Sequence, residues 1–163
     1  MNQETTKGIF NKMADSYDTP ERERVLGIIK KELIRLLAGT PRESVLLDYG
    51  CGTGLMSLPF EDRFESLFLV DIAEEMVEQV KQKCQVLGLS HVKAQILEQF
   101  QANEEKVDVI FVIQTLLHIP DTSQVFKELA GRLKEGGRLI IVDVLKNDQM
   151  SSHLIHHGFS EEE

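Results

Sequence analysis

The stretch VLLDYGCGTGL, residues 45–55, decides how this chain folds. It begins with an apolar segment typical of a short buried strand and then places glycine at every second position, at Gly50, Gly52 and Gly54. Glycine permits positive φ and lets a ligand approach the main chain closely, and the N-terminus of a following helix offers unpaired N–H groups. We interpret the stretch as a strand that ends in a ligand-binding bend, with a purely structural turn as the alternative.

Strand and helix patterns alternate along the rest of the chain. The expected strands cover residues 45–47, 67–70, 92–97, 107–113 and 139–142, and the expected helices cover residues 21–38, 73–87 and 122–134. Gly88 should close the second of these helices, and Gly136 and Gly137 should turn the chain into the last strand. This alternation predicts an α/β fold with right-handed crossovers and a mostly parallel, doubly wound sheet with helices on both faces.

The apolar positions of each expected helix fall on one face. The residues expected to face the core are Val25, Ile29, Leu33 and Leu36 in the first helix, Met76, Val77, Val80, Cys84 and Leu87 in the second, and Val125, Phe126, Leu129 and Leu133 in the third. Asp121 and Gln124 have the spacing of a capping pair at the start of the third helix.

Polar residues gather where the expected strands end. Besides the glycine bend, these positions are Asp71, Glu98, the segment 113–118 and Asp143. Open parallel sheets bind ligands beyond the carboxyl ends of their strands. We therefore expect the functional site at this edge of the sheet.

Composition limits the kind of partner. The chain has 163 residues, enough for one domain with a sizeable core, and a formal net charge of −9. No block of lysine and arginine stands out, which argues against a nucleic-acid-binding protein, and the longest apolar run, VIFVIQTLLHI, is too short to span a bilayer. Cys51 and Cys84 suggest neither a disulfide framework nor a zinc site. We expect a cytoplasmic protein that binds a small molecule and contacts no membrane.

Asp71 follows Gly50 by 21 residues and stands at the tip of the next expected strand, where a carboxylate can accept both hydroxyls of an adenosine ribose. A dinucleotide fingerprint would need glycine at position 55, which is Leu55. Asp48 would repel a pyrophosphate but would help a ligand that carries an ammonium and a sulfonium group. The residues favour such a ligand over NAD, and a nicotinamide-dependent oxidoreductase stays as the alternative.

Five segments carry a resemblance to a known family. LLDYGCGTG resembles the first motif, D-x-G-x-G-x-G, of class I S-adenosylmethionine-dependent methyltransferases, and FLVDIAEEM resembles their second motif. VDVIFVIQTLLHIPD is similar to the stretch around their fourth strand, LKEGGRLIIVD to the segment with their fifth strand, and FNKMADSYD to their N-terminal lead-in. Glu135 replaces a usual proline and Leu117 a usual histidine. The resemblance implies a Rossmann-like fold and methyl transfer from S-adenosylmethionine to a small-molecule acceptor that the motifs do not identify.

The resemblance also implies which residues bind S-adenosylmethionine. The glycine bend would lie along its methionine and ribose parts, Asp48 would face the methionine ammonium, and Asp71 would hold the ribose diol. Glu98, followed by Gln99, is the candidate for reading the adenine amino group. The full set of expected cofactor-binding residues is Tyr17, Asp48, Gly50, Cys51, Gly52, Gly54, Asp71, Ile72, Glu98, Gln99, Ile113 and Gln114. Of these, Ile72 would pack on the adenine, and Tyr17 would cover the cofactor or else be an ordinary partly exposed aromatic residue.

Methyl transfer is an in-line displacement at a carbon activated by a cationic sulfur, so a protein contributes mainly positioning and desolvation. An acceptor with a proton on oxygen or nitrogen also needs a base within hydrogen-bond reach. His118, at the end of the fourth expected strand, is the candidate base, with packing or a cofactor contact as the alternative role. No helix pattern surrounds His153, His156 and His157, so we interpret them as a surface loop and expect no metal site.

We expect one S-adenosylmethionine-binding domain over residues 1–163, with a helical lead-in over residues 1–40 and an α/β core over residues 41–163. The family sheet has seven strands, whereas five are expected here, and Ser160 and Glu163 have the spacing that begins a helix. This pattern predicts a core that is incomplete at its C-terminus and an exposed fifth strand that pairs with a second copy in a homodimer. It also predicts weak or no turnover alongside retained cofactor binding, so a cofactor-binding module without catalysis is the third interpretation.

Overall fold

The computed structural model describes residues 3–145 of the chain. In chain order, its elements are α1 (Gln3–Met13), the short 3-10 helix η1 (Ala14–Ser16), α2 (Pro20–Leu36), β1 (Val45–Tyr49), the 3-10 helix η2 (Leu58–Arg63), β2 (Ser66–Asp71), α3 (Glu74–Leu87), β3 (Val92–Ile96), α4 (Leu97–Gln101), β4 (Val107–Ile113), the 3-10 helix η3 (Leu116–His118), α5 (Thr122–Arg132) and β5 (Leu133–Val142). All five expected strands and all three expected helices are present, with shifts at their ends.

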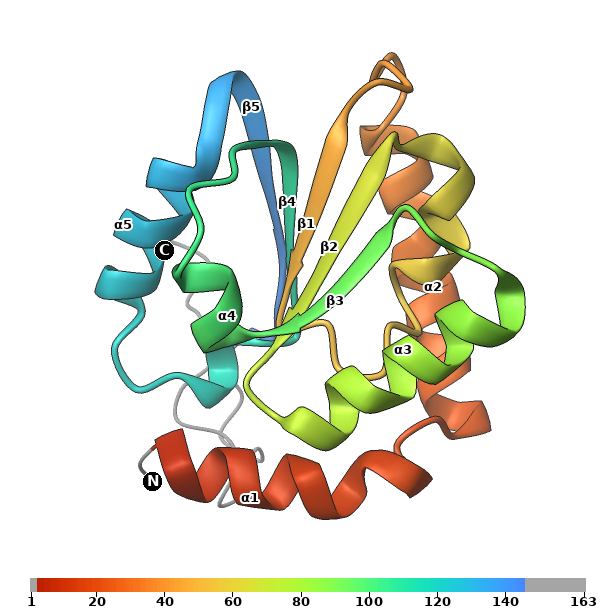
Figure 1. The fold of residues 1–163 in the computed structure, drawn as a ribbon, viewed down its shortest axis with the longest axis vertical. Coiled ribbons are helices and arrows are strands. Elements are labelled where there is room, and N and C mark those ends of the chain that lie inside the picture. Colours follow the sequence, from red (N-terminus) through yellow and green to blue (C-terminus); the bar gives the residue numbers. More distant parts are fainter. Residues whose placement is uncertain (1–2, 146–163) are drawn as a thin grey trace.

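The five strands form one parallel sheet in the order β3-β2-β1-β4-β5. Helices α2 and α3 cover one face of the sheet, and α4 and α5 cover the other (Figure 1). The α/β, doubly wound, Rossmann-like fold predicted from the alternating patterns is therefore confirmed.

Each central strand is buried on both faces, because its alternate side chains enter two separate apolar clusters. In β1, Leu46 packs with α2 and α3, whereas Leu47 packs with α4 and α5. Phe111 and Ile110 of β4 divide in the same way. A strand covered on both sides needs a continuous apolar run, which is why β1, β2 and β4 were recognisable in the sequence.

The expected inward faces of two helices are partly wrong. Val25 and Leu36 of α2 are each 40% exposed, whereas Leu33 and Leu37 are fully buried and Leu26 packs against the same cluster. The buried stripe of α2 therefore lies one position away from the predicted one at both ends. In α3, Leu87 is 63% exposed because it lies in the last turn, just before Gly88 ends the helix in the left-handed conformation.

The start of β5 also differs from the prediction. The expected helix to residue 134 ends at Arg132, and the strand begins at Leu133, which pairs with Val107. Gly136 has a φ of +74°, and the register shifts between Val107 and Val109. The two glycines thus form an irregular part of the strand rather than a turn that precedes it.

Helix α1 lies across the carboxyl ends of the strands (Figure 1). Its Asn11 accepts a hydrogen bond from the backbone N–H of Glu75 and donates one to the side chain of Glu74, and its Lys7 forms an ion pair with Glu74 at 2.6 Å. Ala73, at the N-cap of α3, has no capping side chain. Asn11 therefore satisfies an N-terminal amide of α3 from another part of the chain and fixes α1 against the end of that helix.

The histidines His153, His156 and His157 and the helix start at Ser160 and Glu163 lie outside the described residues. Within residues 3–145, no group of three or more His, Cys, Asp or Glu side chains could hold a metal ion. In the same range, no helix combines the length and the apolar character needed to cross a membrane.

Candidate functional site

A cavity of about 390 Å³ opens at the carboxyl edge of the sheet, where the sequence predicted a site. Of the expected site residues, seven line it: Tyr17, Gly50, Gly52, Asp71, Ile72, Gln114 and His118. They come from the lead-in, the bend after β1, the end of β2 and the segment after β4. These seven residues are far apart in the chain, between positions 17 and 118. They meet at one place because all the parallel strands end on the same side of the sheet.

The glycine bend is bonded to the tip of β2. The backbone N–H groups of Gly50 and Cys51 both donate to the carbonyl oxygen of Val70, at 2.8 and 3.0 Å. The N–H of Gly52 donates to the carboxylate of Asp71 at 2.8 Å. These three bonds hold the bare main chain of the bend against the cavity. They explain why the spacing between the bend and Asp71 could be used to predict a ligand site from the sequence.

Glycine is required at the start of this bend. Gly50 has a φ of +79°, which disfavours any other residue, and a Cβ atom there would lie 2.3 Å from the Thr115 side chain. The Thr115 hydroxyl in turn donates to the Gly50 carbonyl at 3.3 Å. Gly54 has a different reason, since its Cβ would press on Leu58 and Val80 in the core, away from the cavity. The three glycines therefore have two roles: Gly50 and Gly52 form a surface that faces the cavity, and Gly54 allows the turn to pack against the core.

Asp71 ends β2 with its carboxylate facing the cavity. One oxygen accepts the N–H of Gly52, and the other accepts the N–H of Ala73 at 2.9 Å. Burial raises the pKa of Asp71 above its ordinary value, and these backbone N–H groups lower it in part. A carboxylate oxygen accepts more than one hydrogen bond, so each of the two can take a further donor from a ligand.

Asp48 lies beneath the bend and does not line the cavity. It is 2% exposed and accepts a hydrogen bond from the hydroxyl of Ser57. The pKa of Asp48 is raised to about 7: burial raises it most, the Ser57 hydrogen bond lowers it in part, and the negative charge of Asp71 adds a smaller increase. Asp48 can therefore act on a ligand only through the field of its charge and through the bend that it supports.

Five other expected residues lie away from the cavity lining. Cys51, Gly54 and Ile113 pack into the core, and Glu98 and Gln99 are exposed on α4. The sequence suggested a strand up to residue 97, but α4 begins there, and successive helix residues point about 100° apart. This turn directs Leu97 into the cavity and Glu98 outward, near Lys7, whose pKa it helps to raise after the larger effect of Glu74.

Aromatic rings from the lead-in close one side of the cavity. Phe10 of α1 contacts the rings of both Tyr17 and His118 edge-on, at centroid distances of 6.1 and 5.1 Å. The Arg22 guanidinium lies 3.8 Å from the centre of the Tyr17 ring and donates to its hydroxyl at 3.0 Å. Burial raises the pKa of Tyr17. This wall places apolar ring edges, a neutral phenol and an imidazole around the same space.

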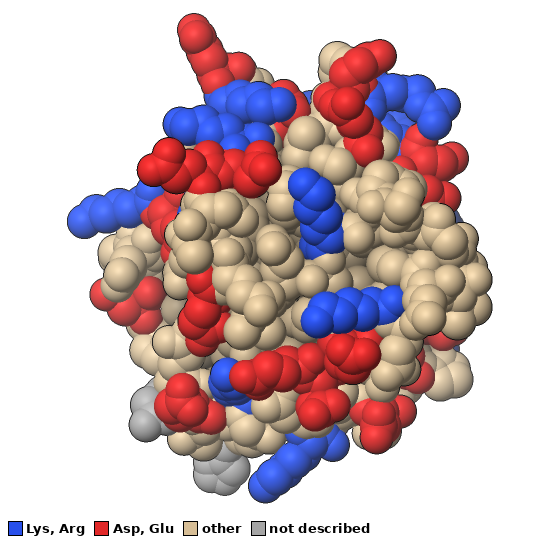
Figure 2. All heavy atoms as spheres, in the orientation of Figure 1, with Lys and Arg blue, Asp and Glu red and all other residues tan. Residues whose placement is uncertain are grey.

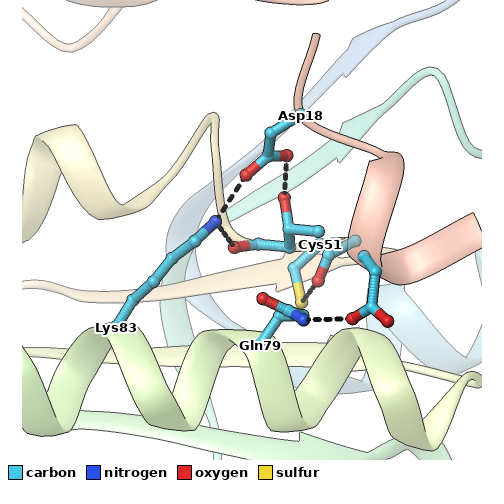
Figure 3. A network of polar contacts seen from close by, with 7 residues as sticks. Asp18, Cys51, Gln79 and Lys83 are labelled. Carbon is cyan, nitrogen blue, oxygen red and sulfur yellow. Dashed lines mark hydrogen bonds and ion pairs between the residues drawn. The ribbon is translucent and has the colours of Figure 1, made fainter.

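Asp18 connects the lead-in to the bend and to α3 (Figure 3). Its carboxylate accepts the hydroxyl of Thr53 and the ammonium of Lys83, and Lys83 also donates to the Thr53 carbonyl at 2.8 Å. Close by, Gln79 donates to Asp15 at 2.9 Å. The network fixes Tyr17, which lies next to Asp18 in the chain, over the Gly52 backbone, where a Cβ atom would come within 3.3 Å of the ring.

The opposite wall was not anticipated from the sequence. It consists of Tyr49 and Val70 from the sheet, Leu97 and Gln101 from α4, and Gln124, Val125 and Glu128 from α5. The one local signal was the position of Tyr49, directly before the glycine bend. The remaining members belong to helix positions whose direction depends on where α4 and α5 begin, which the sequence did not fix.

Asp143 also has a structural role in the site. Its carboxylate accepts the backbone N–H groups of Leu116 and Leu117, at 2.9 and 3.3 Å, at the start of η3. Just before them, Gln114 has a φ of +51°, an uncommon conformation for a residue other than glycine, and its N–H donates to the carbonyl of Val142 at 2.7 Å. β5 and Asp143 thereby hold the segment that carries His118.

Charges on the face seen in Figure 2 are mixed. Acidic and basic side chains are interspersed over it, and near its middle two basic side chains lie among uncharged residues, above a band of acidic ones. On this face no broad basic surface is present of the kind that binds nucleic-acid phosphates.

Comparison with known proteins gives a family match. A model of the family described as "Methyltransferase domain" matches residues 47–141, which include the bend, the tip of β2, the segment after β4 and most of β5. The match covers the elements that build the cavity, apart from the lead-in.

Similar proteins are longer than this chain. The chain is 27% identical over 103 residues to a ubiquinone biosynthesis O-methyltransferase from Coxiella burnetii, a match that covers 63% of this chain and 44% of that protein. It is 31% identical over 115 residues to a sterol 4-C-methyltransferase from Caenorhabditis elegans, covering 68% and 34%. The fold resembles the structure of a DhpI–SAH complex with a TM-score of 0.76 and 20% identity, covering 96% of this chain and 80% of that one.

The raised pKa of Asp48 leads to a test of pH-dependent stability. Because the folded pKa of about 7 lies above the ordinary value of 3.8, Asp48 contributes stability that is fully present below about pH 4 and is lost as the pH rises through 7. Asp48→Asn removes this titration and can still accept the Ser57 hydrogen bond. We expect the variant to gain stability relative to the natural chain between pH 5 and pH 8, measured by urea unfolding.

Asp62→Asn is the matched control, since Asp62 is exposed on η2 and does not line the cavity. It should keep the pH dependence of the natural chain. Parallel stability curves for Asp48→Asn and the natural chain would show that Asp48 is not held above its ordinary pKa.

Proposed function

Because the chain belongs to the class I S-adenosylmethionine-dependent methyltransferase superfamily, we propose that it binds S-adenosylmethionine in the cavity and transfers the methyl group to a small-molecule acceptor. One observation carries the proposal: the cavity places the main chain of Gly50 and Gly52 beside the Asp71 carboxylate, at the carboxyl edge of a parallel sheet. A nucleoside fits such a site because the carboxylate accepts its diol and the bare bend allows close approach.

The proposed pose follows the order of the strand tips. Asp71 accepts the two ribose hydroxyls, and Ile72, next along the chain, packs on the adenine. The methionine part extends from β2 over β1, along Gly50 and Gly52, toward Gln114 at the end of β4. Tyr17 covers the cofactor from the side of the lead-in. The carboxylates of Asp71 and Asp48 favour the positive sulfonium and ammonium groups electrostatically.

The protein's chemical contribution is chiefly positional. When bound, S-adenosylmethionine supplies a methyl group on a cationic sulfur. The cavity holds the cofactor from the bend, and the α1 wall excludes water from the transfer path. His118 faces the same space next to Phe10, so its imidazole is placed to take a proton from an acceptor hydroxyl or amine.

The acceptor supplies an oxygen, nitrogen or carbon nucleophile for the transferred methyl group. Two similar proteins are an O-methyltransferase of ubiquinone biosynthesis and a sterol 4-C-methyltransferase, and this chain spans less than half the length of each. Phe10, Ile119 and Pro120 give the end of the cavity near His118 an apolar character. This composition supports a small molecule with an apolar portion as the acceptor.

The two other interpretations of the sequence have less support. The match to a methyltransferase domain and the presence of Leu55 in place of a third fingerprint glycine both disfavour nicotinamide chemistry. A cofactor-binding module without transfer activity stays as the second candidate, because the carboxylates and the bend would serve it equally well. A transfer assay separates the two.

Calorimetric titration tests the cofactor. We expect S-adenosylmethionine and S-adenosylhomocysteine to bind and NADH not to bind. Asp71→Ala should lower both affinities by about a hundredfold or more, because it removes two hydrogen bonds to a charged acceptor and leaves the Gly52 amide without its partner. Asp62→Ala, on the exposed surface of η2, should leave both affinities unchanged. Binding of NADH alone would overturn the proposal, and an unchanged affinity in Asp71→Ala would overturn the ribose placement.

A transfer assay tests the role of His118. With a hydroxyl- or amine-bearing acceptor that supports turnover, His118→Gln should lower kcat by about a hundredfold while the affinity for S-adenosylhomocysteine changes little. His91→Gln is the control, since His91 lies outside the cavity, next to Glu61. An unchanged kcat in His118→Gln would mean that this residue packs rather than transfers a proton.

We also propose a cytoplasmic homodimer that forms through β5. In the described part of the chain, β5 is the last strand of the sheet and pairs only with β4. Ile141 on this strand is 41% exposed, and edge strands with apolar side chains invite pairing. The cytoplasmic location is supported by two buried cysteines, Cys51 and Cys84, that are both free thiols.

Light scattering coupled to size-exclusion chromatography tests the dimer. Ile141→Lys should shift the natural chain from dimer to monomer, because a charge on the strand opposes apolar contact between copies. Val86→Lys is the matched control, since Val86 is 85% exposed on α3, away from this edge. A monomeric natural chain would contradict the dimer.

A further inference from the structure

We propose that the carboxylate of Glu128, on α5, accepts a hydrogen bond from the exocyclic amino group of the cofactor's adenine, an inference that rests on the proposed binding of S-adenosylmethionine. Glu128 would then select adenine among nucleobases. None of the residues expected from the sequence to read this amino group reaches the cavity.

The two oxygens of Glu128 differ in their surroundings. Oε2 accepts a hydrogen bond from the side-chain amide of Gln101, on α4, at 2.9 Å. Oε1 is buried and has no hydrogen-bond partner among the described residues, although Glu128 lines the cavity. A buried carboxylate oxygen without a partner costs free energy, because it has lost its hydrogen bonds to water and gained none in return. Because this oxygen belongs to a residue that lines the cavity, we infer that a donor group on the ligand supplies the missing hydrogen bond.

The position of Glu128 fits the far end of the adenosine. Asp71 would hold the ribose, and the bend on β1 would hold the methionine part, so the base must extend away from the bend. Asp71 pairs in register with Ile96 of β3, and Leu97 follows at the cavity wall. From Leu97, α4 runs to Gln101, whose amide meets Glu128. The path from the ribose site thus leads along α4 to the unpartnered oxygen.

The chemistry of this wall matches an adenine ring. Besides Ile72, Leu97 of α4 and Val125 of α5 line this part of the cavity with apolar side chains that an adenine ring can contact. Tyr49 lines the same cavity as Asp71 and Glu128: burial raises the pKa of its phenol most, followed by the charges of Glu128 and then Asp71. The exocyclic amino group of adenine is a hydrogen-bond donor. An ionised carboxylate can only accept hydrogen bonds, so Glu128, which already accepts one from Gln101, is a suitable partner for this amino group. A base with a carbonyl oxygen at this edge would place two hydrogen-bond acceptors against each other.

The end of β3 places no competing acceptor side chain in the cavity, since Gln95, whose Oε1 is also buried without a partner, does not line it. Ile96 is apolar, and α4 starts at the next residue, so Glu98 and Gln99 are exposed on its outer side. Glu98 instead interacts electrostatically with Lys7 of α1. The amino group therefore has Glu128 as the acidic partner on this wall of the described structure.

The test compares two ligands that differ at one edge of the base. S-inosylhomocysteine carries a carbonyl oxygen where S-adenosylhomocysteine carries the amino group. We expect the natural chain to prefer the adenosyl ligand by about 10–100-fold in calorimetric Kd, the range for a hydrogen bond to a charged acceptor. Glu128→Gln, whose amide can donate as well as accept, should reduce this preference to about twofold or less. Thermal unfolding of the variant checks that it is folded.

Glu98→Gln is the matched control, because it makes the same change on the exposed side of α4. It should keep the preference of the natural chain. A preference that persists in Glu128→Gln, or collapses in Glu98→Gln, would overturn the role of Glu128 while leaving S-adenosylmethionine binding intact. Failure of S-adenosylhomocysteine to bind the natural chain would overturn the proposed function itself, so the two failures are distinct.

Discussion

The cavity depends on three hydrogen bonds between the glycine bend and the end of β2. Two amides of the bend share the carbonyl of Val70, and a third donates to the Asp71 carboxylate. This arrangement satisfies N–H groups that would otherwise be orphans at the start of a turn, and it leaves a surface of bare main chain. The same carboxylate that fixes the bend also faces the cavity, so the geometry of the loop and the ligand contact cannot vary independently.

The parts of the site that sequence could predict are those set by local chemistry. A strand buried on both faces needs an apolar run, and a left-handed bend against Thr115 needs glycine at position 50, so β1, the bend and Asp71 were all recognisable. The directions in which helix side chains point were harder to predict from the sequence. A shift of one residue in the start of α4 rotates its side chains by about 100°, enough to turn Glu98 outward and bring Leu97 into the cavity. The Asn11 cap on α3 joins residues 64 apart, and no local pattern indicates it.

The buried carboxylates give the site its electrostatic character. Burial raises the pKa values of both Asp48 and Asp71, and the negative charge of Asp71 further opposes ionisation of Asp48. A ligand cation in the cavity, beside Asp71, would offset this repulsion and favour the ionised forms. An anionic pyrophosphate would increase it, which is the physical reason why this bend suits a sulfonium ligand better than a dinucleotide.

The lead-in is attached differently from the rest of the site. Its ion pairs, such as Lys7 with Glu74 and Asp18 with Lys83, have partly exposed partners, and such pairs contribute only about 0–1 kcal/mol each. The buried contact is made by Ala14, which packs with Phe10 and Tyr17 against Ala73 and Met76 at the start of α3. Polar contacts therefore set the orientation of α1, while apolar packing supplies most of the stabilisation. Since the same Phe10 and Tyr17 rings form the cavity wall, filling the cavity with a ligand would add apolar contact to the lead-in.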